Sequence, residues 1–175
     1  MRVARVGRET KDGPARLILR TVLGGTMIAH GVRHGRTLEG TAKWFSTIGF
    51  RRARLQAAVS SALEVGAGAA LVAGAATPLS ASAVVGTMAV AGHTVHRPNG
   101  FFVVDEGWEY VAVVAAASVA LSSLGAGRYS LDRALGVDRL GTPFRRALLT
   151  GGLGVAGASA HLRLFWSPPP AAGSA

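Results

Sequence analysis

The sequence contains no cysteine, and this absence excludes disulfides, thiolate-bound zinc, iron–sulfur clusters and thiol catalysis within the chain. Charged residues are also scarce: they make up 16% of the chain, against about a quarter of an average soluble domain. Between Leu55 and His96 the only formally charged side chain is that of Glu64. Because a soluble domain needs polar groups on its surface, this composition indicates a protein whose apolar surface is covered by lipid.

Several sequence motifs are absent as well. There is no Walker loop, dinucleotide-binding fingerprint or nucleophile elbow, and we expect no cleavable signal because the first apolar run follows a long basic stretch. The net charge is +10, but the basic residues crowd beside the apolar runs, as membrane proteins place them against anionic lipid. The expected partner is therefore the lipid bilayer and not nucleic acid, which would call for a basic groove interleaved with aromatic residues.

Five apolar segments follow one another along the chain, at residues 17–32, 55–77, 79–95, 108–124 and 147–166. A helix needs roughly 17–25 apolar residues to cross a bilayer. The second segment meets this length easily and the third and fourth are at its short end, so all three predict spanning helices. The first predicts a spanning helix on the condition that the membrane tolerates Arg20 and the region of His30. The fifth is rich in glycine, and we expect it either to cross the membrane or to lie in its interface. The predicted fold class is all-α, a transmembrane four-helix bundle with a candidate fifth membrane segment at the C-terminus.

This pattern also predicts the organisation of the chain. It comprises a basic cytoplasmic N-terminus at 1–16, a four-helix membrane domain at 17–132, a basic linker with the fifth apolar segment at 133–166, and a disordered tail at 167–175. Lys and Arg are more abundant in the segments that become cytoplasmic when the N-terminus is inside, which favours that orientation. The link at 33–54 mixes basic and aromatic residues, which predicts an amphipathic stretch at the membrane surface.

Small residues recur every four positions in the second segment, at Ala62, Gly66, Ala70 and Gly74. Such a stripe lets another helix approach closely within lipid, so it predicts the packing face of this helix. Arg20, near the start of the first segment, is expected to extend its side chain toward the membrane interface.

The polar residues of the apolar segments are expected to converge. Consecutive spanning helices alternate in direction, so the ends of segments one and three meet the starts of segments two and four on the same membrane face. His30, Glu64, His93 and Glu109 then fall in the same half of the bilayer, with Glu64 about 14 Å into its segment at 1.5 Å per residue. These four residues form the predicted ligand-binding site, for which no catalytic residue and no metal ligand is assigned.

Glu64 carries the strongest signal, because a carboxylate near mid-membrane is costly and usually faces the bundle interior. Its expected partner is His30 or His93, since a shared proton lowers the desolvation cost. The alternative is a protonated Glu64 that serves only as a hydrogen-bonding strut between helices. Histidine pairs could also hold a metal or a haem, but no Glu-x-x-His motif supports this. Asp105, Glu106 and Asp132 are expected to be solvated or to cap helices.

At these residues the chain resembles the DoxX family of small bacterial membrane proteins. The matching stretches are "HGVRHG", "FSTIGF", "ALEVGAGAALVAGAATPLSA", "GHTVH", "GFFVVDEGWEY" and "GAGRYSLD", which together run from about Arg20 to Asp132. The ending "GRYSLDRALG", followed by a further apolar segment, is similar to actinobacterial members. The positions that carry over from the family are His30, Gly31, Glu64, Gly66, His93 and Glu109, whereas His34 replaces a lysine often found there.

The resemblance implies a four-helix bundle in the bacterial plasma membrane and a link to redox chemistry. Named members are associated with quinone-linked sulfur oxidation, as subunits of thiosulfate:quinone oxidoreductase or of a terminal quinol oxidase, and others with redox-stress complexes. This implies a subunit of a quinone-linked oxidoreductase, with a quinone as its candidate cofactor and with soluble redox enzymes or other membrane subunits as partners.

Three functions are consistent with the sequence. The first is a redox-linked subunit that binds a quinone or another small amphipathic molecule in the His/Glu pocket, where an apolar slot adjoins a proton donor. The second is a non-catalytic membrane scaffold that recruits soluble redox or stress enzymes, which the absence of cofactor motifs favours. The third is a transporter of a small metabolite, although no inverted repeat supports it.

Overall fold

A computed structural model describes residues 13–139 and 141–169, and the regular elements of this part are helices. Five of the helices are long and pack side by side: α2 (Gly13–Arg36), α4 (Ala53–Ala73), α5 (Thr77–Ala91), α6 (Glu109–Leu124) and α8 (Pro143–Phe165). The all-α prediction is therefore confirmed. The number of long helices is five and not four, because the last apolar segment forms α8 and packs along α5 and α6.

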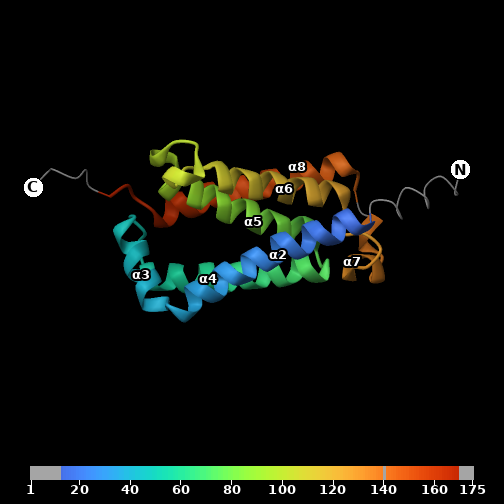
Figure 1. Cartoon of the computed structure of the whole chain (residues 1–175), viewed down its shortest axis with the longest axis horizontal. Coiled ribbons are helices and arrows are strands. Elements are labelled where there is room, and N and C mark those ends of the chain that lie inside the picture. Colours follow the sequence, from blue (N-terminus) through green and yellow to red (C-terminus); the bar gives the residue numbers. More distant parts are fainter. Residues whose placement is uncertain (1–12, 140, 170–175) are drawn as a thin grey trace, which may run out of the picture.

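The long helices form two layers. One layer is the antiparallel pair α2 and α4, and the other contains α5, α6 and α8 (Figure 1). The layers meet at the short turn between α4 and α5 and diverge toward the opposite end of the molecule (Figure 1). At that open end α3 (Leu38–Thr47) runs across the end of α4. The two layers are therefore farthest apart at the end that holds the C-terminus of α2 (Figure 1).

Glycines set the close approach of α2 and α4. A Cβ atom on Gly24 would lie 2.5 Å from the carbonyl oxygen of Gly68, and one on Gly68 would lie 2.6 Å from that of Gly24. Farther along, Ser61 Oγ donates a 2.7 Å hydrogen bond to the carbonyl oxygen of Gly31. The predicted stripe is wrong in its register, because Ala62 and Gly66 are exposed and a Cβ on Gly66 would meet no atom within 4 Å. Close backbone approach, and not the four-residue spacing alone, selects the packing face.

Helix α8 is joined to α5 and α6 by small and hydroxylated residues. The buried hydroxyl of Thr150 donates to Ser122 Oγ at 2.6 Å and lies 3.2 Å from the carbonyl oxygen of Pro78. A Cβ on Gly86 of α5 would come within 3.2 Å of the Gly154 carbonyl oxygen. Helix α8 thus belongs to the same bundle as the segments before it.

Two buried charged residues, Arg20 and Asp132, join the segments that meet at the end of the bundle where α4 turns into α5. Arg20 is 3% exposed and donates to the carbonyl oxygens of Leu71, Val72, Ala126 and Tyr129 at 2.5–3.0 Å. It does not extend to an interface as predicted, because the C-terminus of α4 offers it unpaired carbonyl groups.

Asp132 has the complementary role at the start of α5. Its carboxylate accepts from the backbone N–H groups of Ala76 and Thr77 at 2.7 and 2.9 Å, and from Thr77 Oγ1 at 2.6 Å. Of the two expectations for Asp132, a helix cap is the one observed, although the helix it caps is 55 residues earlier in the chain.

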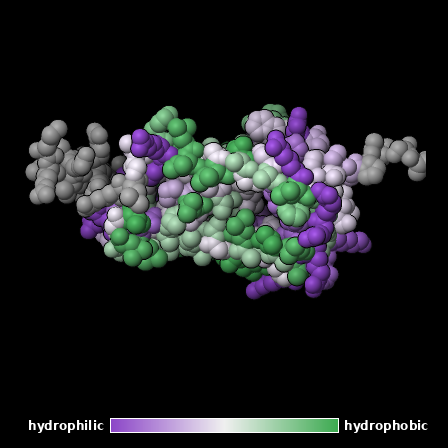
Figure 2. All heavy atoms as spheres, turned by 180° about the vertical axis from the view of Figure 1, so that it is seen from behind, coloured by the Kyte–Doolittle hydropathy of each residue, from purple (hydrophilic) through white to green (hydrophobic). Residues whose placement is uncertain are grey.

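The surface pattern agrees with a bundle whose long axis crosses a lipid bilayer. Hydrophilic side chains gather at the two ends of the molecule and hydrophobic ones between them (Figure 2). By length and composition, however, α4 is the single described helix that is apolar enough to cross a membrane, and α6 is apolar but shorter. Of the predicted spans, this criterion supports the second in full and the fourth in part.

Candidate functional site

A cavity of about 940 Å³ occupies the space between the two layers at the end that α3 crosses. Four of the five histidines of the chain line it, His30 and His34 from α2, His96 after α5, and His161 from α8. The rest of its wall is mainly apolar, with aromatic residues from α3 on one side and glycines of α5 and α8 on another. A volume of this size is within the range of pockets that bind small molecules.

Glu64 lies in the wall of this cavity and is 3% exposed. One of its oxygens, Oε1, accepts a 2.6 Å hydrogen bond from Ser60 Oγ and lies 3.2 Å from Nδ1 of His34. The partner of Glu64 is therefore His34, and not His30 or His93 as predicted. His34 lies one helical turn beyond His30 on α2.

The local sequence of α2 explains how this contact forms. A Cβ on Gly31 would lie 2.9 Å from Cβ of Glu64, so only glycine lets the two backbones come this close. The next turn then presents His34 to the carboxylate. The histidines and glycines of "HGVRHG" thus act together: the glycines bring the helices into contact and the histidines face the cavity.

The opposite wall is built around an irregular turn after α5. The segment η1 (Gly92–His96) is a π-helix, closed by a hydrogen bond from the N–H of Arg97 to the carbonyl oxygen of Gly92. The wider turn separates two histidines that an α-helix would place on one face. His96 lines the cavity and its Nδ1 lies 2.6 Å from the backbone oxygen of Glu106, whereas His93 faces the outside of the layer. Such π-turns occur frequently at functional sites.

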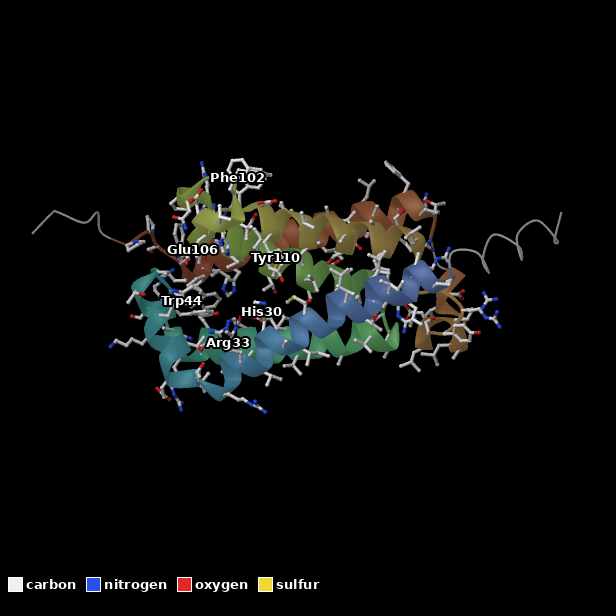
Figure 3. All side chains as sticks on the ribbon, in the orientation of Figure 1. His30, Arg33, Trp44, Phe102, Glu106 and Tyr110 are labelled. Atoms are coloured by element: carbon white, nitrogen blue, oxygen red, sulfur yellow. The ribbon has the colours of Figure 1, made fainter. Side chains whose placement is uncertain are left out.

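Polar side chains from both layers face each other near the cavity mouth. Glu106 and Tyr110 come from the upper layer and its connecting loop, and His30 and Arg33 come from α2 below them (Figure 3). Trp44 of α3 lies beside them at the end of the cavity (Figure 3). The mouth therefore combines cationic, acidic and phenolic groups, whereas the lining from α5 and α8 is made chiefly of small and apolar residues.

The C-terminal end of α8 closes one side of the cavity. Trp166 Nε1 donates to the carbonyl oxygen of Ile48 at 2.7 Å, and the N–H of Arg51 donates to the carbonyl oxygen of Phe165 at 2.8 Å. These bonds hold the loop after α3 against α8. His161 then packs against the ring of Phe50, with centroids 5.7 Å apart.

The structure brings together two of the four predicted site residues. His30 and Glu64 line the cavity. His93 lines a separate hollow and packs edge-on against Trp166, with ring centroids 5.1 Å apart. Glu109 lines neither, and its Oε2 instead accepts from the N–H of Val103 at 3.0 Å. Glu109 is held at the start of α6, where a carboxylate is favoured by the free N–H groups of the helix.

Several cavity residues were not predicted from the sequence. His34 could have been found, because it lies four positions after His30 on the same helical face. Glu106 was expected to be solvated or to cap a helix. It lines the cavity instead, and its backbone has a left-handed conformation with φ of 61°. His161 belongs to the fifth apolar segment, which was expected either to cross the membrane or to lie in its interface, and only the packing of α8 against the other helices brings it to the cavity.

The chemistry available to this arrangement is polar recognition beside an apolar volume. Imidazole, carboxyl and phenol groups can donate or accept hydrogen bonds to a ligand headgroup. Among the described residues, no group of three or more His, Asp or Glu side chains is placed to hold a metal ion.

Comparison with known families gives one match. The DoxX family model matches residues 15–97, which extend from α2 to the turn after α5 and include His30, His34, Glu64 and His96. The match is shorter than the sequence resemblance suggested and leaves α6 and α8 outside it. No curated protein and no solved structure matches the chain.

The DoxX family is membrane-associated, which agrees with the lipid-facing composition of the chain. Residues 15–97, just under half of the chain, match the DoxX family of membrane proteins, and this match supports membership of that family.

Proposed function

We propose that this protein crosses the bilayer with its five long helices and binds a small amphipathic molecule in the cavity between its two layers. The observation that carries the proposal is the polarity of the cavity. Four histidines, Glu64 and Glu106 are gathered in its wall, while its remaining lining is largely apolar. A ligand with a compact polar head and an apolar body matches both parts.

A quinone is the ligand class that fits this lining best. Its carbonyl oxygens accept hydrogen bonds, and His30 and the Glu64–His34 pair supply groups that can donate or exchange protons. Its ring can pack against Trp44 and Phe45, which line the cavity beside the histidines. The protein would then serve as the quinone-binding subunit of a redox complex, whose electron-transferring groups belong to other subunits.

The proposed topology places the N-terminus in the cytoplasm. The cavity then opens in the outer half of the bilayer, because it lies at the end where α2 terminates. The abundance of Lys and Arg before α2 and around α7 (Leu131–Ala134) supports this orientation.

Binding of a short-chain naphthoquinone to the detergent-purified protein tests this function. We expect saturable binding, weakened about tenfold or more by Glu64→Gln. Glutamine removes the carboxylate that pairs with His34, and a charge-assisted hydrogen bond from that pair to a quinone oxygen contributes about 1.5–3 kcal/mol. The matched control is Glu39→Gln, which removes a carboxylate of the same end of the molecule that is 77% exposed and does not line the cavity. Equal binding by both variants, or no binding by the unaltered protein, would contradict the quinone assignment.

A further inference from the structure

A second hollow, of about 530 Å³, lies on the outer side of the layer formed by α5, α6 and α8. Its floor is formed by Val85 and Ala89 of α5 and by Gly92 at the start of η1, and one wall is α6, with Ala112 and Ala115. The residues Met88 and Val111 line both this groove and the cavity, so their side chains stand between the two. The groove therefore faces away from the proposed quinone site.

One end of the groove is polar. His93, Arg97 and Trp108 line it there. Arg97 is exposed, and its guanidinium has no hydrogen-bond or ion-pair partner among residues 13–139 and 141–169. The indole of Trp108 is held in place by an edge-on contact with Phe101, with centroids 4.8 Å apart.

The acidic residues nearby do not neutralise this end from within the groove. Asp105, Glu106 and Glu109 do not line it. Glu106 faces the cavity, and the carboxylate of Glu109 is bonded to the N–H of Val103. The groove thus presents a cationic and aromatic end to an apolar channel, which is complementary to a ligand with an anionic head and a hydrocarbon chain.

The length of the groove agrees with such a ligand. Val85 and Arg97 are twelve residues apart, which corresponds to roughly 18 Å along a helix. One leaflet of the hydrocarbon core is about 15 Å thick, half of the bilayer value. An acyl chain that lies along the groove from Val85 therefore ends where Arg97 and Trp108 lie, at the level of the headgroups.

We propose that this groove binds an anionic glycerophospholipid, with one acyl chain on the α5 floor and the phosphate at Arg97 and His93. The guanidinium can donate two parallel hydrogen bonds to phosphate oxygens, and Trp108 borders the glycerol region. The site is independent of the quinone proposal, because it shares no polar residue with the cavity. A second copy of the chain is the competing occupant.

Native mass spectrometry of the detergent-purified full chain tests the proposal with two added lipids of identical acyl chains. We expect phosphatidylglycerol to be retained in preference to phosphatidylcholine, with one molecule bound per chain. Arg97→Gln should lower this retention about fivefold, the effect expected for one cation near an anionic lipid surface. Arg163→Gln is the matched control, because Arg163 is an exposed arginine of the same end that lines neither hollow.

A second variant, Ala112→Trp, fills the apolar part of the groove and should lower the retention of both lipids. The guanidinium of Arg97 is exposed and makes no hydrogen bond or ion pair within the described residues, so Arg97→Gln should fold normally. This variant therefore tests lipid binding even if Ala112→Trp fails to fold. Equal retention of the two lipids, or equal loss in Arg97→Gln and Arg163→Gln, would overturn the proposal. A stable dimer that dissociates on Ala112→Trp would also overturn it and assign the groove to a second copy.

Discussion

Nδ1 of His34 lies 3.2 Å from Oε1 of Glu64, although thirty residues separate them along the chain. This contact joins α2 to α4 at the wall of the cavity and leaves the carboxylate 3% exposed. A buried carboxylate that touches both a histidine and a ligand-sized cavity can serve the fold, the ligand or both. The two roles predict different behaviour of the same substitutions.

Glu64→Gln should leave the fold intact and impair function. Glutamine keeps the shape and can still accept from Ser60 Oγ, and a neutral amide costs less to bury than a carboxylate. Ligand retention should therefore fall while the thermal midpoint in detergent stays nearly unchanged. If Glu64→Gln retains full activity and only Glu64→Ala loses stability, Glu64 is a structural strut and not part of a binding site.

His34→Ala should reproduce the functional loss of Glu64→Gln, whereas His93→Ala should not. His34 contacts the carboxylate, while His93 lies outside the cavity and packs on Trp166. The measurement is the dissociation constant of the naphthoquinone for each variant. A larger effect from His93 than from His34 would show that the cavity geometry does not govern binding.

Gly68→Ala should destabilise the protein, and Gly66→Ala should not. A Cβ on Gly68 would meet the Gly24 carbonyl oxygen at 2.6 Å, which forces the two helices apart at a cost of about 1–3 kcal/mol. Gly66, two positions away on the same helix, has open space around its Cα, so alanine there gains about 0.5–1 kcal/mol of helix propensity. Thermal unfolding of both variants in the same detergent measures the difference. Equal midpoints would argue against the observed α2–α4 contact.

Arg20→Met should lower stability strongly without a change at the cavity. The substitution leaves carbonyl groups of α4 and of the loop after α6 without their donor, at about 1–3 kcal/mol for each that stays buried. The control is Arg54→Met, which removes an exposed ion pair with Glu39 and should cost no more than about 1 kcal/mol. Thermal midpoints that fall equally in the two variants would contradict a buried capping role for Arg20.

The absence of cysteine makes the membrane topology directly measurable. Cysteines introduced at Asn99 and at Arg128 lie at opposite ends of the bundle, and both positions are exposed. With the N-terminus inside, a membrane-impermeant maleimide should label Asn99→Cys in intact cells and should label Arg128→Cys only after permeabilisation. The reverse pattern would invert the orientation, and labelling of both in intact cells would contradict a spanning bundle.

The sequence by itself determined the class of the protein and pointed to part of its candidate site. Scarce charge and five apolar segments indicated a helical membrane protein, and the isolated Glu64 indicated a buried polar site. These inferences hold because composition and hydrophobic run length report directly on the solvent around a helix. They required no knowledge of which helix touches which.

Only the tertiary structure decided the contacts within the site. The spacing of His93 and His96 indicated that both lie on one face of a helix. A π-helical turn instead places His96 in the cavity wall and His93 in the separate groove. His161 reaches the cavity because α8 packs along α5, a contact between segments some seventy residues apart. The hydrophobic periodicity of a segment defines the faces of that helix but not the helices that pack against them. Which residues meet across helices follows from packing, and packing depends on the whole chain.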